Sequence, residues 1–148
     1  MRKSKDEYYL NIAEAVLTRS TCLRRKYGAV IVKDDEIIST GYNGSPRGWA
    51  NCCDLGDCAR IQENIPHGQH HYDECRSVHA EANAIISASR RDMIASTLYL
   101  AGIEADGTPI LDAKPCFMCL RLILNAGISS VVTRNNHGSI NRMEVRHE

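Results

Sequence analysis

Two short motifs constrain this chain more than any other feature: His-x-Glu at residues 79–81 and Pro-Cys-x-x-Cys at residues 115–119. Thiolate and imidazole groups are good ligands for Zn²⁺. Three protein ligands leave the fourth tetrahedral position open to water, which is typical of a catalytic zinc site rather than a structural one. The motifs therefore predict that His79, Cys116 and Cys119 bind a zinc ion.

Each motif is expected at the start of a helix. Pro115 suits a first helical turn, where its missing N–H costs nothing. Cys116 and Cys119 are then i, i+3 neighbours, and the positive end of the helix favours their thiolate forms. If a second helix starts near His79, Glu81 can point into the same pocket and move protons between a water and a substrate.

The specificity of this prediction comes from the combination of the two motifs. A single Cys-x-x-Cys in an intracellular chain also fits a redox pair or half of a structural zinc site. The two motifs in this order, each with helical patterning after it, favour a catalytic centre. The alternative is a purely structural zinc site in which Glu81 is a solvated helix residue.

Length and composition limit the class of protein. A chain of 148 residues fits a single domain, residues 1–148, with a Cys/His-rich insertion at about residues 48–76. The formal net charge is zero, which gives no support for binding long nucleic acid. We find neither a membrane-spanning stretch nor a signal peptide. Seven cysteines, an odd number, suit metal binding in a reducing cytoplasm better than a disulfide framework.

Apolar periodicity predicts alternating helices and strands, with a polar hairpin turn at residues 33–36. The expected helices cover residues 6–20, 78–89 and 116–126, the last ending at Gly127; the expected strands cover residues 28–32, 37–42, 97–101 and 129–133. Between them lies a long loop over residues 43–76, and loops of this length are usually functional or held by something. The alternation after residue 78 indicates an α/β sandwich with parallel strands at that end.

With these motifs in hand, the chain resembles the cytidine deaminase superfamily and, within it, the deoxycytidylate (dCMP) deaminases. The H-x-E and P-C-x-x-C pair is a known signature of zinc-dependent nucleobase deaminases. The narrower likeness rests on residues 20–25, 28–32 and especially 40–48, Thr-Gly-Tyr-Asn-Gly-Ser-Pro-Arg-Gly, and it runs from about residue 5 to about residue 133.

This resemblance implies a three-layer α/β/α sandwich with a mixed five-stranded sheet. It implies zinc held by His79, Cys116 and Cys119, with Glu81 as the proton carrier. The implied activity is hydrolysis of dCMP to dUMP and ammonia in pyrimidine deoxynucleotide metabolism. Many members of the family are hexamers that dCTP and dTTP regulate, so we expect a homo-oligomer with such effectors.

The resemblance also suggests substrate contacts. It gives Asn43 as a sugar-binding residue, although Asn-Gly is equally a common turn pair. It makes Arg90 a phosphate partner, although a cation completing a helix C-terminus is an equal alternative. Arg47 has the same ambiguity, and Ala80 completes the predicted set. The chain departs from the family after residue 132, where polar residues replace the usual tyrosine and aromatics, and Arg134 there is a further phosphate candidate.

The remaining cysteines and several histidines gather around the long loop. Some dCMP deaminases hold a structural zinc between the N-terminal segment and this insertion. By position, Cys22, Cys52 and Cys75 match the likeness best, with Cys58 as the fourth ligand and His71 or Cys53 as substitutes. A closed four-ligand site would stabilise a loop that has little core. The alternative is a set of buried free thiols that act as small hydrophobes.

Other functions stay open from the sequence alone. The nearest rival is a deaminase of another substrate: dCTP, a free nucleoside or base, an aminopyrimidine of riboflavin synthesis, or a modified nucleotide. A more distant rival is a non-catalytic binding protein in which zinc is only structural. A deaminase that edits RNA or DNA is disfavoured, because no basic groove is evident.

Overall fold

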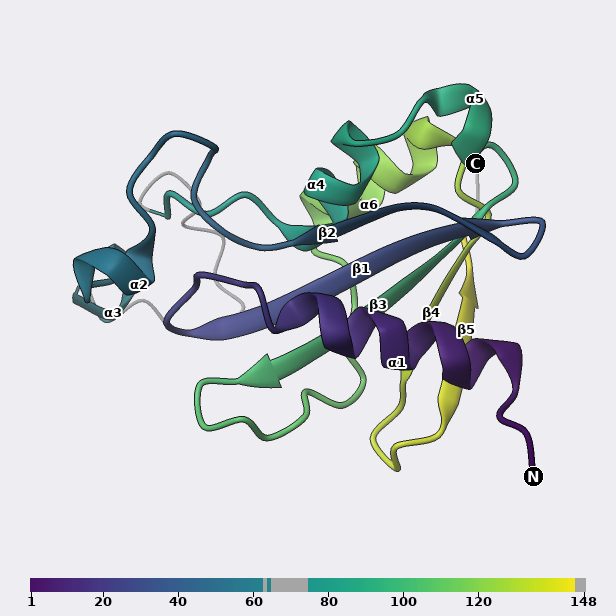
Figure 1. The fold of residues 1–148 in the computed structure, drawn as a ribbon, viewed down its shortest axis with the longest axis horizontal. Coiled ribbons are helices and arrows are strands. Elements are labelled where there is room, and N and C mark those ends of the chain that lie inside the picture. The colour runs from purple at the N-terminus through teal and green to yellow at the C-terminus, as the bar shows by residue number, and fades with distance from the viewer. Residues whose placement is uncertain (63, 65–74, 146–148) are drawn as a thin grey trace.

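The fold is built on one mixed five-stranded sheet, as the computed structural model shows for residues 1–62, 64 and 75–145 (Figure 1). The strand order is β2-β1-β3-β4-β5. The strands span Arg25–Lys33 (β1), Glu36–Tyr42 (β2), Thr97–Glu104 (β3), Ser130–Arg134 (β4) and Ile140–Glu144 (β5). β3 and β4 are parallel, and the other neighbours are antiparallel. The predicted mixed sheet is confirmed.

The first two strands form the predicted hairpin. Asp34 and Asp35, at its tip, have φ values of 51° and 62°. Positive φ at both central residues is the requirement of the tight turns that match the twist of paired strands, and aspartate tolerates this conformation. The polar turn read from the sequence therefore sets the pairing of Lys33 with Glu36. An irregularity between Ile31 and Val32 then shifts the register by one residue, so that Gly28 faces Tyr42.

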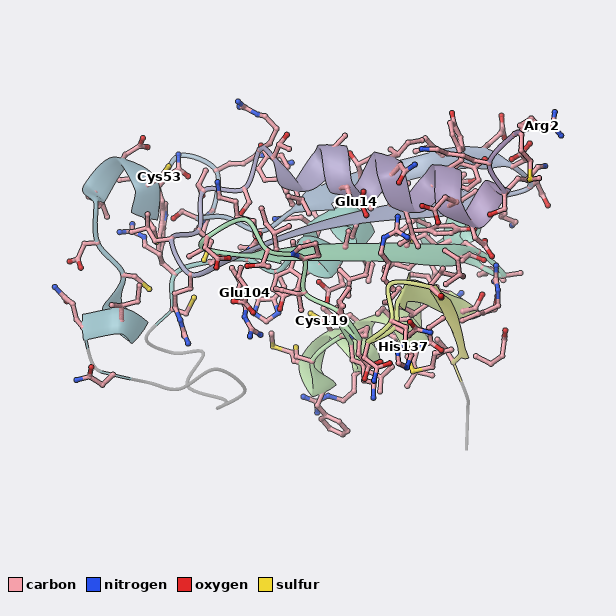
Figure 2. All side chains as sticks on the ribbon, turned by 90° about the horizontal axis from the view of Figure 1, so that it is seen from below. Arg2, Glu14, Cys53, Glu104, Cys119 and His137 are labelled. Carbon is pink, nitrogen blue, oxygen red and sulfur yellow. The ribbon has the colours of Figure 1, made fainter. Side chains whose placement is uncertain are left out.

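Helices cover the two faces of the sheet. α1 (Lys5–Leu17) packs on one face, where Leu10 and Val30 belong to the same buried cluster. α4 (Ala80–Ile86) and α6 (Phe117–Ala126) lie on the other face, where Ile31 and Ile123 are buried together. Figure 2 shows the sheet between α1 and α6. Successive side chains of β1 point to opposite faces of the sheet, so this strand contributes to both buried clusters. The result is the predicted three-layer α/β/α arrangement.

The helix predicted over residues 78–89 is shorter, because it stops at Ile86. A separate short helix, α5 (Arg90–Met93), follows it, and the Ser89 hydroxyl at its N-cap accepts a hydrogen bond from the backbone N–H of Asp92 at 3.4 Å. Serine favours such caps over helix interiors, which explains the break. α4 also sits unusually close to β2: a Cβ at Gly41 would lie 2.4 Å from the Ala80 carbonyl. Gly41 therefore lets the start of α4 approach the sheet.

Two further segments complete the fold. In the described part of the long loop, two short helices form, α2 (Cys52–Leu55) and α3 (Ala59–Gln62), which Figure 1 shows beyond one end of the sheet. The segment after residue 132, which departs from the family pattern, forms a hairpin in which β5 pairs antiparallel with β4. The Asn135 side chain holds its turn by accepting hydrogen bonds from the backbone N–H groups of His137 and Ser139. In the part of the chain that the structure describes, no helix is long and apolar enough to cross a membrane.

Candidate metal centre and active site

The three predicted zinc ligands meet at one point. The Nδ1 atom of His79 lies 3.5 Å from the Sγ atom of Cys116 and 3.3 Å from the Sγ atom of Cys119. A tetrahedral zinc with Zn–N near 2.0 Å and Zn–S near 2.3 Å would separate its nitrogen and sulfur ligands by about 3.5 Å. Among the described residues, this is the one group of three or more Cys, His or acidic side chains gathered closely enough to hold a metal ion. The donor set and its spacing therefore fit zinc.

Helix starts place these ligands. His79 is the N-cap residue of α4, and Cys116 is the N-cap residue of α6. The Cys116 sulfur accepts a hydrogen bond from the backbone N–H of Cys119 at 3.3 Å, as a serine would at this position. The helix therefore begins one residue later than the sequence suggested. Pro115 precedes the cap and is not part of the first turn.

Glu81 lies in the first turn of α4 and is 5% exposed. Burial raises the pKa of its carboxyl group above the usual range, while a backbone hydrogen bond and nearby His79 work in the opposite direction. A hydrogen bond with Cys116, burial and the Glu81 carboxylate raise the pKa of the Cys119 thiol. Two sulfurs and a carboxyl this close need a cation to become anionic together, and Zn²⁺ supplies that charge.

Comparisons with known proteins agree with this geometry. Residues 3–135 match the family model described as the cytidine and deoxycytidylate deaminase zinc-binding region. The chain belongs to this family. It is 41% identical over 135 residues to the deoxycytidylate deaminase of Mycobacterium phage D29, and the match covers 88% of this chain and 94% of that protein. The deoxycytidylate deaminase of Saccharomyces cerevisiae is 37% identical, but the match covers only 38% of its length.

A solved structure matches the fold. The dCMP deaminase of cyanophage S-TIM5 in its apo form aligns with a TM-score of 0.64 and 29% identity, covering 91% of this chain and 86% of that one. The same enzyme in complex with dCMP and dUMP aligns with a TM-score of 0.63 and 26% identity, covering 91% of this chain and 84% of that one. This deaminase therefore has the zinc-dependent hydrolytic chemistry of its family, and the zinc prediction is confirmed.

Asn43 lies beside the metal centre but is already engaged in hydrogen bonds. Its Oδ1 atom accepts hydrogen bonds from the Ser20 hydroxyl at 2.6 Å and the Tyr27 backbone N–H at 2.8 Å. Its Nδ2 group donates to the Arg25 carbonyl at 2.9 Å. The side chain is 7% exposed and ties three segments together. An amide carries two N–H donors, so only the second one can serve a ligand.

The other predicted substrate residues lie apart from one another. Ala80 is buried at the start of α4, next to His79. Arg47 is exposed on the loop that follows Asn43. Arg90 donates from Nε to the Asn125 carbonyl at 3.0 Å, so it caps the C-terminal end of α6. This is the alternative role anticipated for Arg90, although on a different helix.

Arg134 lies on the opposite face of the sheet from the metal centre. Its guanidinium forms ion pairs with two α1 residues, Glu7 at 2.8 Å and Glu14 at 2.9 Å, and it also bonds Asn11. The hydrogen bonds with Glu7 are the largest cause of the raised pKa of Arg134. The structure therefore does not bring Arg134 to His79, and it gives this arginine the role of joining β4 to α1.

The four cysteines expected to hold a second metal gather in one region. Burial raises the pKa of the Cys52 thiol, and the nearby thiols of Cys22, Cys58 and Cys75 raise it further. The backbone N–H of Arg24 also points at the Cys22 sulfur, at 3.4 Å. By contrast, Cys53 is exposed. His67, His70 and His71 lie outside the described residues.

Two polar groups near His79 went unnoticed in the sequence. The Ser77 hydroxyl is buried without a hydrogen-bond partner, two residues before His79 in an extended segment. Side chains two residues apart in an extended segment project to the same side, so Ser77 faces the same side as His79. This spacing could have identified Ser77 from the sequence. The Nε atom of Arg76 is also buried and has no hydrogen-bond partner among the described residues, and its guanidinium lies 5.3 Å from the Trp49 ring centroid.

Proposed function

We propose that this protein hydrolyses dCMP to dUMP and ammonia in pyrimidine deoxynucleotide metabolism. The observation that carries the proposal is the His79, Cys116 and Cys119 cluster beside a buried Glu81, in a chain 41% identical to a phage deoxycytidylate deaminase over nearly its whole length. The S-TIM5 enzyme, whose fold this chain shares, was solved with dCMP and dUMP. The chain then acts as one deaminase domain, residues 1–148, with an insertion at about residues 48–76.

Glu81 carries the protons of the reaction. His79, Cys116 and Cys119 would hold a zinc ion that supplies a water nucleophile at neutral pH, by lowering the pKa of that water to about 7. Burial raises the pKa of the Glu81 carboxyl, which makes it a better proton acceptor than an exposed glutamate while it remains able to return the proton. Glu81 accepts one proton from the attacking water and delivers it to N3 of the base. It then takes the second proton from the new hydroxyl at C4 and delivers it to the amino group, which leaves as ammonia while the C4 carbonyl of dUMP forms. The low exposure of Glu81 keeps bulk water away from these transfers.

Residues of the loop beside the metal centre bind the sugar and the phosphate of the substrate. Asn43 offers one amide N–H to the sugar, and flanking Gly44 lets the ligand approach the backbone. Among the arginines, Arg47 and Arg76 are the phosphate candidates that the fold supports best. Arg47 is exposed close to Asn43, and Arg76 has a buried Nε without a partner three residues before His79. Arg90 and Arg134 already have structural partners.

We further propose a second, structural zinc held by Cys22, Cys52, Cys58 and Cys75. Support comes from Cys52, whose thiol pKa is raised by the neighbouring thiols of Cys22, Cys58 and Cys75, although the four sulfurs are less closely gathered than the catalytic ligands. The backbone N–H of Cys53 also bonds the Thr21 carbonyl at 3.1 Å, so the N-terminal segment and the start of α2 already touch. A four-cysteine site would fix the insertion where the apolar core does not reach.

We also propose a homo-oligomer, with the hexamer and the dCTP and dTTP effectors of the family as the expected form, in the cytoplasm. The outward face of α6 and the end of α4 expose apolar side chains: Phe117 at 66%, Met118 at 39%, Leu122 at 39% and Ile86 at 67%. Large apolar side chains exposed on neighbouring helices favour association. All seven cysteines are free thiols, which suits a reducing compartment.

Ammonia release tests the proposed activity. The panel comprises dCMP, dCTP, deoxycytidine, cytosine, and adenine and guanine nucleotides, each with zinc-loaded enzyme and with a Glu81→Gln control. We expect dCMP to be the best substrate and the control to be inactive. Preferred turnover of any other compound would show that this deaminase acts in another reaction.

A further inference from the structure

A row of directly opposed residues leads from the metal centre across the sheet. Gly44 and Val78 form an antiparallel bridge, so His79 faces Asn43. Asn43 and Tyr27 face each other in turn, since each backbone N–H donates to the other residue, at 3.4 Å and 2.8 Å. Tyr27 is then paired with Gly102 of β3. Opposed residues on neighbouring strands project to the same face, so Tyr27 shares the face of His79.

The Tyr27 ring fills the space above Gly102. A Cβ at Gly102 would lie 2.7 Å from the Cε1 atom of Tyr27, so only glycine permits this position. Tyr27 packs against the buried cluster that includes Ala80 and Leu100, which is the cluster beneath α4 and α6. The phenol is therefore held on the floor of the catalytic face rather than on the α1 face, where Tyr9 and Tyr99 lie.

A fixed guanidinium lies near Tyr27, two residues before it on β1, where side chains two apart share a face. Arg25 is clamped by Glu104, with Nη2 to Oε1 at 2.8 Å and Nε to Oε2 at 3.1 Å. Arginine carries only N–H donors, so Arg25 offers no acceptor to the phenolic proton, which stays available for another acceptor.

The charges around Tyr27 keep it a donor. Burial is the main reason that the pKa of the Tyr27 phenol is raised, and the Glu81 and Glu104 carboxylates raise it further against the effect of Arg25. The phenol is therefore protonated at neutral pH.

We propose that Tyr27 is a specificity-determining residue whose hydroxyl donates a hydrogen bond to the 3′-hydroxyl oxygen of the bound nucleotide. This inference rests on the proposed function. The reacting carbon of the base must face His79 and Glu81, and the sugar is attached on the far side of the ring. Tyr27 is two strand positions from His79, about 10 Å at the usual strand spacing. That separation exceeds the width of a pyrimidine ring and suits the sugar.

The test compares Tyr27→Phe with the wild type on dCMP and on 2′,3′-dideoxycytidine monophosphate, which lacks the 3′-hydroxyl. We expect the wild type to lose about tenfold in kcat/KM on the dideoxy compound, the range of one hydrogen bond. Tyr27→Phe should lose a similar factor on dCMP and then treat both compounds alike. Tyr99→Phe is the matched control, because the Tyr99 hydroxyl bonds Asp6 on the opposite face. It should discriminate like the wild type.

The possible outcomes distinguish a failure of the proposed function from a failure of the inference about Tyr27. If zinc-loaded wild type does not deaminate dCMP, the proposed function and this inference both fail. If it does, but the wild type ignores the 3′-hydroxyl or Tyr27→Phe discriminates as the wild type does, the inference alone fails. Zinc content and thermal melting verify that Tyr27→Phe is folded. Should it not fold, Tyr27→Leu, which also lacks the phenolic hydroxyl, should show the same loss of discrimination.

Discussion

His79 and Cys116 each occupy the position immediately before a helix, and their Nδ1 and Sγ atoms lie 3.5 Å apart. Two helices from distant parts of the chain thus begin at one point. Because both helices pack on the same face of a rigid sheet, the ligand positions are set by backbone packing rather than by a flexible loop. Both sulfurs belong to the start of α6, whose positive end favours their anionic forms.

Glu81→Gln should keep both zinc and the fold but lose deamination. The amide is nearly the same size and still fits the buried site, but it cannot carry a proton. Loss of a general acid–base group costs about 10²–10⁴ in rate. The measurement is ammonia release by a variant whose zinc content equals that of the wild type. Near-normal activity in such a sample would remove Glu81 from the mechanism.

Cys119→Ala should lose the catalytic metal and the activity together. Cys119 is fully buried, and two remaining protein ligands should hold zinc poorly. Cys116→Ala should do the same and also weaken the start of α6, because the Cys116 sulfur caps that helix. Elemental analysis after dialysis checks both variants. Full catalytic occupancy in either one would contradict the ligand assignment.

Much of this site was predictable because it depends on local rules. The two motifs fix the ligand types, and the hairpin turn and helix periodicity follow from residues adjacent in the chain. Arg134 was not predictable in the same way. Its partners Glu7 and Glu14 lie more than a hundred residues away, and nothing local tells an arginine which face of the sheet it will join. Tyr27 was missed for the same reason, since its role depends on cross-strand pairing with Gly102.

Removal of the proposed structural zinc should lower stability. Cys52→Ser or Cys75→Ser should reduce the metal content from about two zinc ions per chain to about one and lower the melting temperature. Cys53→Ser is the matched control, because this neighbouring thiol is exposed. It should change neither quantity. One zinc per chain in carefully loaded wild-type protein would reject the second site.

The Arg134 ion pair predicts an acid-dependent loss of stability. The hydrogen bond from Arg134 holds the pKa of Glu7 below its ordinary value of 4.5. A depressed carboxyl pKa stabilises the folded state above the unfolded pKa, and that contribution disappears as the pH falls through the folded value. Glu7→Gln should therefore melt about 2–4 °C below the wild type at neutral pH, since a partly exposed pair contributes at most about 1 kcal/mol.

The check is thermal melting of both proteins from pH 7 down to pH 3. The difference between them should shrink as the pH falls below 4.5 and vanish in acid. A difference that stays constant across this range would mean that Glu7 stabilises the fold through packing rather than through its charge.

The phosphate should be recognised along with the base. Binding energy from remote groups of a substrate can lower the barrier at the reacting carbon. dCMP should therefore exceed deoxycytidine in kcat/KM by at least about tenfold, the effect of one charge-assisted hydrogen bond of about 1.4 kcal/mol. Arg47→Ala or Arg76→Ala should shrink this ratio while deoxycytidine turnover changes little. Arg90→Ala is the control, because its guanidinium bonds the Asn125 carbonyl. Equal turnover of dCMP and deoxycytidine by the wild type would refute nucleotide recognition, while the zinc deaminase chemistry would stand.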